Sequence, residues 1–327
     1  MTGAPVCSIL IPTRNRAERL AETLRSLGRQ EGIGKAEIIV IDDGSTDSTT
    51  DQLRTLTDCI PAQLRLLAQS HRGPAAARNL GIRESRGHLV IFTGDDIEPL
   101  DGWMTAHFTA HQSQPVETVA ILGKTFPPQR HSPFMRFLTQ ECSSQFDYAA
   151  LDRGQVPDYR FFYTSNLSVK RSMLAREAGP FDERFDLAAW EDIDLGYRLA
   201  RQGLKIVYEP AAGAVHHHLY TLPDFLRRQE SSGRMAFRFL GKHPELERDV
   251  FPPDVSFARR LFRSFPGAAH ALLRGMEHLC PDPLAGKLFY RALMASAFEC
   301  GFLSAASVES PGPARQPGGV SGSSLEG

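Results

Sequence analysis

The chain has 327 residues, 42% of them hydrophobic, which suits one large domain, or a domain with an appendage, around a sizeable core. Lys and Arg number 37 against 38 Asp and Glu, which gives a formal net charge of −1. This balance gives no reason to expect a nucleic acid as partner, although a single nucleotide can still bind at a local site.

The cysteine pattern, the first five residues and the lack of a membrane-spanning stretch lead us to expect a cytoplasmic protein, or one at the inner face of the membrane. Five cysteines lie far apart without a Cys-x-x-Cys pair, which argues against a cysteine-zinc site and fits a reducing compartment. Residues 1–5 lack the features of a signal peptide. The longest apolar stretch, 288–306, contains Arg291 and Glu299, so we interpret it as amphipathic or core-packed rather than membrane-spanning.

The first half of the chain alternates apolar runs with helical spacing. Strands are predicted at residues 6–11, 37–41, 64–67 and 88–92. Helices are predicted at 16–30, from an N-cap at Ser45 to about Leu56, and at 74–84. This alternation predicts an α/β fold with a mostly parallel sheet flanked by helices.

The second half is less regular, and the chain divides into three parts. Further strands are predicted at 119–122, 161–169 and 205–209, with a loop or lid over 127–160. Helices are predicted at 171–177, 191–203, 223–240, 257–276 and 284–306. In the helix at 191–203, a buried stripe is expected to consist of Ile193, Tyr197, Ala200 and Leu204. We therefore predict a domain over 1–225, a helical region over 226–306 and a disordered tail over 307–327.

Reactive side chains follow the predicted strands where each strand ends. They form three clusters, Thr13-Arg14-Asn15-Arg16, Asp42-Asp43-Gly44-Ser45 and Gly94-Asp95-Asp96. Ligands of open α/β sheets bind at this edge. A crevice rich in carboxylates repels a diphosphate unless a cation lies between them, so Mn²⁺ or Mg²⁺ held by Asp95 and Asp96 is one interpretation. Ordinary turn chemistry is the other.

Three further segments carry candidate groups, each with a structural alternative. Arg78 lies in a helix among small residues and is either a ligand contact or a surface arginine. Glu191 and Asp192 occupy the first turn of a helix, where acids stabilise the helix dipole but where a general base is also well placed. Side chains alternate along an extended chain, so His216 and His218 can share a face, while solvated or hydrogen-bonded histidines are the competing interpretation.

Taken in order, six segments resemble the family 2 glycosyltransferases, which have the GT-A fold. The first three are Ile11-Pro12-Thr13-Arg14-Asn15-Arg16, Val40-Ile41-Asp42-Asp43-Gly44-Ser45-Thr46-Asp47, and Gly73 with Ala77-Arg78-Asn79. The others are Phe92-Thr93-Gly94-Asp95-Asp96, then Asn166-Leu167-Ser168-Val169 with Gly179-Pro180-Phe181-Asp182-Glu183, and the run from Trp190-Glu191-Asp192 to Leu199. Together they cover about residues 5–220.

The resemblance implies a role for each matching residue. It assigns Asp192 as catalytic base in an inverting displacement, and Asp96 with His216 as metal ligands. It places Asn166 and Glu191 near the transferred sugar or the acceptor. The residues implied for the nucleotide donor are Thr13, Arg14, Asp43, Arg78 and Asp95. The partners it implies are a UDP-linked sugar, by family habit, and a glycan, lipid-linked or other hydroxyl acceptor, with Mn²⁺ or Mg²⁺ as cofactor.

One departure from the family's Asp-x-Asp motif keeps two other functions open. Gly94 stands where the first aspartate is expected, which favours a non-catalytic nucleotide-sugar binder, whereas the intact Glu191-Asp192 pair opposes it. A sugar-phosphate nucleotidyltransferase is the second alternative. Such enzymes have a Gly-rich loop after the first strand, and the segment 12–16 contains no glycine.

The region beyond residue 225 is apolar and locally basic, and we consider two roles for it. One is that its helices cap the domain. The other is peripheral membrane contact, with apolar faces in the interface and arginines on anionic headgroups. The apolar residues are Phe257, Leu261, Phe262, Phe265, Leu288, Phe289, Phe298 and Phe302. The arginines are Arg227, Arg228, Arg234, Arg238, Arg259, Arg260 and Arg263.

Overall fold

A computed structural model describes residues 4–56, 60–129, 132–141, 148, 151–177, 179–251 and 283–309. The predicted helix at 257–276, residues 310–327 of the predicted tail and three of the five cysteines (Cys59, Cys142 and Cys280) lie outside these ranges. Residues 307–309, predicted as the start of a disordered tail, belong instead to the helix Pro283–Glu309. Cys7 is fully buried, as expected of a small core residue.

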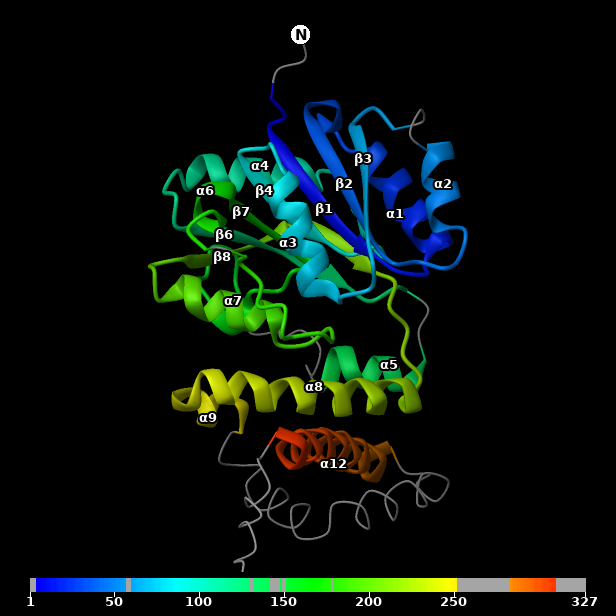
Figure 1. Cartoon of the computed structure of the whole chain (residues 1–327), viewed down its shortest axis with the longest axis vertical. Helices are drawn as coiled ribbons and strands as arrows, with labels where there is room; N and C mark the ends of the chain where they lie inside the picture. The colour runs from blue at the N-terminus through cyan, green and yellow to red at the C-terminus, as the bar shows by residue number, and fades with distance from the viewer. Residues whose placement is uncertain are drawn as a thin grey trace, which may run out of the picture.

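An eight-stranded mixed sheet forms the centre of the fold (Figure 1), with strand order β3-β2-β1-β4-β7-β6-β8-β5. The strands are β1 (Cys7–Thr13), β2 (Ala36–Asp43), β3 (Gln63–Gln69), β4 (Leu89–Thr93), β5 (Ile97–Pro99), β6 (Val119–Phe126), β7 (Asn166–Lys170) and β8 (Lys205–His216). The first four are parallel, as predicted. Strand β7 runs antiparallel to β4 and β6, and β5 runs antiparallel to β8. The carboxyl ends of β1, β2 and β4 therefore share one edge.

Helices cover both faces of the sheet because its strands are apolar on both sides. Ile9 and Ile11 of β1 pack in one core cluster, whereas Leu10 between them packs in the other. The first cluster includes residues of α1 (Ala17–Gly28), α2 (Thr49–Leu56) and α4 (Trp103–Ser113). The second includes residues of α3 (Pro74–Glu84), α6 (Arg171–Leu174) and α7 (Glu191–Ala200).

Three local expectations were wrong. Helix α2 begins at Thr49 rather than at a cap on Ser45, because the Ser45 hydroxyl instead accepts the backbone N–H of Asn15. In α7 the buried stripe consists of Leu195 and Leu199, whose side chains face the sheet, and not of Ile193 and Tyr197. The segment 127–160 is not a single irregular loop, since its described part contains short helical segments at Pro133–Arg136, Phe137–Glu141 and Tyr159–Phe161. Strand β5 and helix α4 were not predicted from the sequence.

Helix α8 (Leu222–Lys242) lies between the α/β body and α12 (Pro283–Glu309), as Figure 1 shows. The helices α8 and α12 approach closely at Gly233 and Gly301. A Cβ at either position would meet a backbone oxygen of the opposite helix at 1.9 Å, so a side chain would force the helices apart. Short helical segments follow α8 at Pro244–Leu246 and in α9 (Glu247–Val250). Within the described residues, no helix has the length and apolar content that crossing a membrane requires.

Candidate functional site

A cavity of about 450 Å³ lies between the carboxyl ends of the strands, the start of α7 and the inner face of α8. Six of the ten residues predicted for the site line it: Arg78, Asp95, Asp96, Glu191, Asp192 and His216. Arg16, Trp190 and His218, which belong to segments already singled out, line it as well, as does Arg228 of the basic C-terminal region. The lining residues for which no role was expected include Tyr163, Thr164, Ser165, Tyr220, Gln229 and Ser232. The carboxyl ends of β1 and β4 therefore meet at one cavity, whereas the cluster after β2 does not line it.

Asp96 is the centre of a cluster with two histidines. Nδ1 of His218 lies 3.0 Å from Oδ2 of Asp96, and Nε2 of His216 lies 3.4 Å from Oδ1. Antiparallel pairing of β5 with β8 brings the segments together, since the His217 backbone N–H donates to the Asp96 carbonyl at 2.8 Å. One potential ligand atom from each of Asp96, His216 and His218 lies within 4.8 Å of the other two.

This donor set fits a divalent cation. A carboxylate with two imidazoles suits Mn²⁺ better than Mg²⁺, which strongly prefers oxygen ligands. Burial by itself raises the pKa of Asp96, but hydrogen bonds from the two histidines and the charge of Arg16 outweigh it and hold the pKa well below its usual range. A Cβ at Gly94 would lie 2.9 Å from Oδ1 of Asp96, so a side chain there would displace the carboxylate.

His217 points to the other side of the strand, as alternation requires. Its Nε2 lies 2.7 Å from Oε2 of Glu98. Of the two interpretations of the three histidines, the structure supports the shared face for His216 and His218. His218 was not among the metal ligands predicted from the sequence. Its position two residues after His216 was the pattern that could have identified it.

Asp95 turns toward β1 and α1. Its Oδ2 accepts from the Thr13 hydroxyl at 2.7 Å, and its Oδ1 lies 3.1 Å from Arg16. The same Arg16 nitrogen reaches Oδ2 of Asp96 at 2.6 Å. Burial and the neighbouring charge of Asp96 raise the pKa of Asp95 to about 6. Arg16 therefore neutralises part of the charge of both carboxylates.

Asp43 organises the loop after β3 and does not line the cavity. Its carboxylate accepts from Gln69 at 2.7 Å and from the backbone N–H groups of Arg72 and Gly73 at 2.8 and 2.9 Å, and it contacts His71 at 2.7 Å. Arg14 contacts the other nitrogen of His71 at 2.9 Å. Thr13, Arg14 and Asp43 thus lie at the ends of β1 and β2, outside the cavity lining, and their contact with a nucleotide stays a prediction.

The start of α7 positions Asp192. Its carboxylate accepts the Ile193 backbone N–H at 2.9 Å and is also hydrogen-bonded by the backbone of Thr164. Burial, and then the charge of Glu191, raise the pKa of Asp192 to about 7, against the opposing charge of Arg78. A carboxyl that titrates near neutrality inside a cavity has the properties of a general base.

Glu191 and Trp190 fix the segment that presents Asp192. Oε1 of Glu191 accepts from Arg78 of α3 at 2.9 Å, and the Arg78 guanidinium lies over the ring of Phe181. Trp190 adopts a left-handed backbone conformation, with φ of 69°, which is uncommon for a bulky residue. Its indole N–H donates to Ser232 of α8 at 3.0 Å. Helix α8 thereby holds the segment as well as lining the cavity.

Asn166 is fully buried and is not part of the cavity lining. Its Oδ1 accepts from the indole of Trp103 at 2.7 Å and lies 3.0 Å from Nε2 of His107. Its amide donates to the carbonyl of Ala212 in β8 at 2.8 Å. Asn166 therefore joins α4, β7 and β8, and a direct contact with a sugar stays a prediction.

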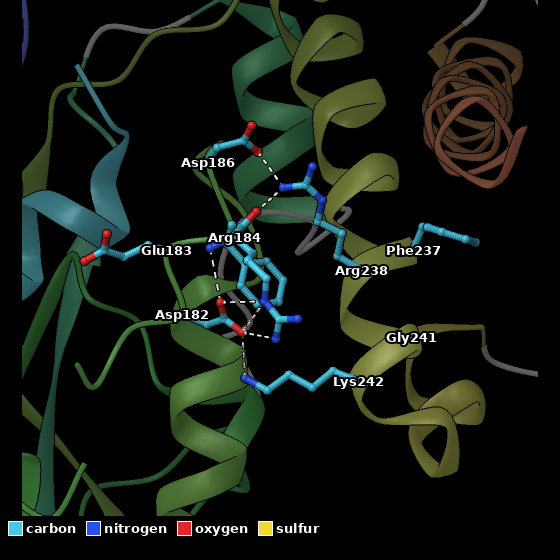
Figure 2. A pocket seen from close by; sticks show the side chains of 9 residues that line it. Asp182, Glu183, Arg184, Asp186, Phe237, Arg238, Gly241 and Lys242 are labelled. Carbon is cyan, nitrogen blue, oxygen red and sulfur yellow. Dashed lines mark hydrogen bonds and ion pairs between the residues drawn. The ribbon is translucent and has the colours of Figure 1, made fainter. Parts of the chain in front are cut away.

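A second cavity, of about 620 Å³, lies between the 182–186 loop and α8 (Figure 2). Asp182 accepts from Arg184 at 2.7 Å and from Lys242 at 3.0 Å, and Arg238 contacts Asp186 at 3.0 Å. The hydrogen bonds from Arg184 hold the pKa of Asp182 below its usual range. These charged groups pair with one another across the gap. We infer that these ion pairs hold the 182–186 loop, which precedes α7, against α8.

Comparisons with known proteins agree with this geometry. The profile described as "Glycosyl transferase family 2" matches residues 8–175. A pre-mycofactocin glycosyltransferase of Mycobacterium tuberculosis is 29% identical over 242 residues, which cover 73% of this chain and 48% of that protein. A validoxylamine A glucosyltransferase of Streptomyces hygroscopicus is 28% identical over 276 residues, which cover 76% of this chain and 63% of that protein. The chain thus spans about half to two thirds of the length of these relatives.

The fold also matches a solved structure. A mannosyltransferase from Pyrobaculum calidifontis, in complex with GDP-Man and Mn²⁺, superposes with a TM-score of 0.60 at 20% identity. The match covers 94% of this chain and 88% of that chain. At this identity the likeness concerns the fold alone, and it confirms the predicted GT-A architecture.

Proposed function

The chain belongs to glycosyl transferase family 2, and we propose that it transfers a sugar from a nucleotide-diphosphate donor to an acceptor hydroxyl. One observation carries the proposal: the Asp96–His216–His218 cluster and Asp192, with its raised pKa, line the same cavity. A cation site and a base facing one cavity are what a displacement of a diphosphate by a hydroxyl requires. The curated relatives described above are named as glycosyltransferases.

Asp96, His216 and His218 would hold a divalent cation, Mn²⁺ by preference. When bound, such a cation offsets the charge that develops on the departing diphosphate. Arg16, which pairs with both Asp95 and Asp96, keeps this end of the cavity charge-balanced. Gly94 removes the first carboxylate of the family's Asp-x-Asp motif, but this does not argue against a cation site. The imidazoles of His216 and His218 would supply ligands in its place.

Asp192 would accept the proton of the acceptor hydroxyl as that oxygen attacks the anomeric carbon. A single displacement inverts the anomeric configuration. The Thr164 backbone and the start of α7 orient the carboxyl, and Arg78 holds Glu191 beside it. We propose that Arg78 and Asp95 bind the nucleotide, together with Thr13, Arg14 and Asp43 at the neighbouring strand ends. For Asn166 we propose a positioning role through the Ala212 carbonyl of β8.

The donor is a UDP- or GDP-linked sugar, and the acceptor is a glycan, a lipid-linked sugar or another hydroxyl compound. We further propose peripheral membrane contact through the C-terminal region, where Arg227 and Arg234 of α8 are exposed. Most of the other residues behind this idea, including Phe257, Phe262 and Arg260, lie outside the described ranges.

The function is tested by incubating the protein with UDP- and GDP-sugars and Mn²⁺ and analysing the products. A transferase releases a nucleoside diphosphate, in the presence of an acceptor or slowly to water. Release of pyrophosphate from a sugar phosphate and a nucleoside triphosphate would instead identify a nucleotidyltransferase. Binding of sugar nucleotides without turnover, across a panel of simple glycoside acceptors, would identify a non-catalytic binder.

A further inference from the structure

The residue that precedes α7 adopts a conformation that its own chemistry does not favour. Trp190 has φ of 69° and ψ of −15°, a left-handed conformation that costs free energy for a bulky side chain. It also makes no side-chain capping bond, whereas the usual N-cap residues are extended and carry a side-chain acceptor. Local preferences therefore do not explain the start of α7, so contacts from another part of the chain stabilise it.

Helix α8 supplies such contacts on both sides of the base. The indole N–H of Trp190 donates to the Ser232 hydroxyl at 3.0 Å, and the centroids of the Trp190 and Phe239 rings are 5.0 Å apart. Phe239 is fully buried, in an apolar cluster against which both Trp190 and Ile193 pack. These two residues lie on either side of Asp192 in the chain. The base therefore belongs to a short segment that packs on α8.

A second contact ties the same turn to the end of α8. The backbone N–H of Asp194 donates to the Trp190 carbonyl at 2.8 Å, which closes the first turn of α7. The fully buried Asp194 carboxylate contacts Lys242 at 2.8 Å and His243 at 2.8 Å. Both ends of the turn are thus bound by α8 or by the residue after it, and Asp192 lies between them.

The placement of this turn decides where the Asp192 carboxylate points. A general base must lie within hydrogen-bond reach of the proton it accepts, and a displacement of about 1 Å can cost about 10²-fold in rate. The cation cluster, by contrast, is carried by the segment before β5 and by the end of β8. Loss of the contacts between α8 and Trp190 should therefore affect the transfer step and leave cation binding intact.

We propose that Trp190 is a positioning residue, through which Ser232 and Phe239 of α8 set the geometry of Asp192. The positioning role rests on the proposed function, in which Asp192 is the base. It makes the helical region beyond residue 225 a contributor to the transfer step as well as a wall of the cavity.

Hydrogen-bond variants of the full chain give the first test. The substrates are Mn²⁺, a methyl glycoside and whichever of UDP-glucose, UDP-N-acetylglucosamine or GDP-mannose the wild type turns over. Ser232→Ala and Trp190→Phe each remove the indole bond, so each should lower kcat by about 3- to 10-fold and leave donor Kd and acceptor KM unchanged. The double variant should be no slower than the slower single variant, because both changes remove the same bond. Ser232→Thr keeps the hydroxyl and should retain the wild-type kcat.

Two further variants separate the positioning role from general loosening and from backbone strain. Tyr197→Phe is the matched control, because it removes another bond between α7 and the C-terminal region, from the Tyr197 hydroxyl to Glu245 at 2.8 Å, away from Asp192. It should leave kcat unchanged. Trp190→Gly adopts the left-handed conformation without penalty but loses both contacts with α8, so its kcat should be lower than that of Trp190→Phe.

Wild-type kcat in Ser232→Ala and Trp190→Phe, or in Trp190→Gly, would overturn the positioning role. A loss that Tyr197→Phe shares would also overturn it, as would a higher acceptor KM with unchanged kcat, which indicates direct contact with the acceptor. These failures appear only in the variants. If the wild type turns over none of the sugar nucleotides, or if Asp192→Asn turns over normally, the proposed function or its base fails first, and the positioning role fails with it.

Discussion

Nδ1 of His218 lies 3.0 Å from Oδ2 of Asp96, although 122 positions separate the two residues in the chain. The short strand β5 begins directly after Asp96 and pairs with the end of β8, where Ile97 lies opposite His216. This pairing fixes the distance between the carboxylate and the two imidazoles. The proposed cation site therefore depends on an edge strand of three residues.

We expect Mn²⁺ affinity to depend on His218 and not on His217. His218→Ala should weaken Mn²⁺ binding at least tenfold, because even partners outside the ligand shell contribute about 10- to 100-fold. His217→Ala is the matched control, since its ring pairs with Glu98 on the other side of the strand. Isothermal titration with MnCl₂ measures both constants. Equal losses in the two variants would show that the cluster holds no cation.

Asp96→Ala should abolish the metal-dependent part of donor affinity, whereas Asp95→Ala should lose less. The reason is that Asp96 contacts both histidines, while Asp95 is bonded to Thr13 and Arg16. Calorimetry of the sugar nucleotide with Mn²⁺ and with EDTA measures the difference. Donor affinity that is the same in both solutions for the wild type would instead indicate a metal-free site.

Asp192→Asn should reduce kcat by about a hundredfold or more and leave donor affinity intact. The amide keeps the shape of the side chain but cannot accept a proton. Asp186→Asn is the matched control, because Asp186 lies in the second cavity and its side chain is 58% exposed. Steady-state kinetics and donor Kd give the comparison. Near-normal turnover by Asp192→Asn would remove this residue from the mechanism.

The rate of transfer should rise with pH through about 7 and then level. Burial and the charge of Glu191 raise the pKa of Asp192 to about 7, and the base acts only when ionised. Glu191→Gln should move this limb of the pH–rate profile to lower pH, since it removes a neighbouring negative charge. A profile that is flat between pH 6 and 8 (roughly one unit on either side of that pKa) would exclude Asp192 as the titrating group.

The raised pKa of Asp192 should also make the stability of the protein depend on pH. The pKa of Asp192 is raised from 3.8, so between these values the folded protein holds a proton that the unfolded chain has lost. The contribution of Asp192 to the free energy of unfolding therefore falls as pH rises from about 4 to about 7. Asp192→Asn should flatten this part of the stability curve, which urea denaturation at several pH values measures.

Asp194→Ala should destabilise the protein by about 3–5 kcal/mol, the range for breaking a buried ion pair. The carboxylate of Asp194 is fully buried and contacts Arg198 at 2.9 Å, Lys242 at 2.8 Å and His243 at 2.8 Å. Two of these partners belong to the end of α8 or follow it, so the cluster joins α7 to the C-terminal region. Glu22→Ala, which removes an exposed pair with Arg19, should cost at most about 1 kcal/mol in the same urea titration.

The full chain should float with anionic vesicles at low salt and stay at the bottom of the gradient at high salt. Arginine contacts with headgroups weaken as the Debye length shortens. Neutral phosphatidylcholine vesicles are the control. If the chain does not float with anionic vesicles at low salt, the proposed membrane contact is wrong, and capping the domain remains as the role of the C-terminal helices.

Local patterns alone determined much of this protein. The apolar runs that predicted the parallel strands correspond to β1 to β4, and the bounds predicted for α3 are those observed, Pro74–Glu84. The rule that ligands bind at the carboxyl ends of strands predicted that Asp95 and Asp96 lie at the binding edge of the sheet. The alternation of side chains predicted that His216 and His218 share one face. These features depend on neighbours in the chain, so the sequence contains them.

The tertiary structure decided which groups have partners and which face each element buries. Ser165 and Ser168 are the same residue type three positions apart, yet only the fold places His107 and His111 against one hydroxyl and leaves the other without a hydrogen-bond partner among the described residues. The buried face of α7 likewise follows from the sheet it packs on rather than from its own spacing. Hydrogen-bond partners and burial are set by contacts between distant segments, and local patterns in the sequence do not reveal which segments meet.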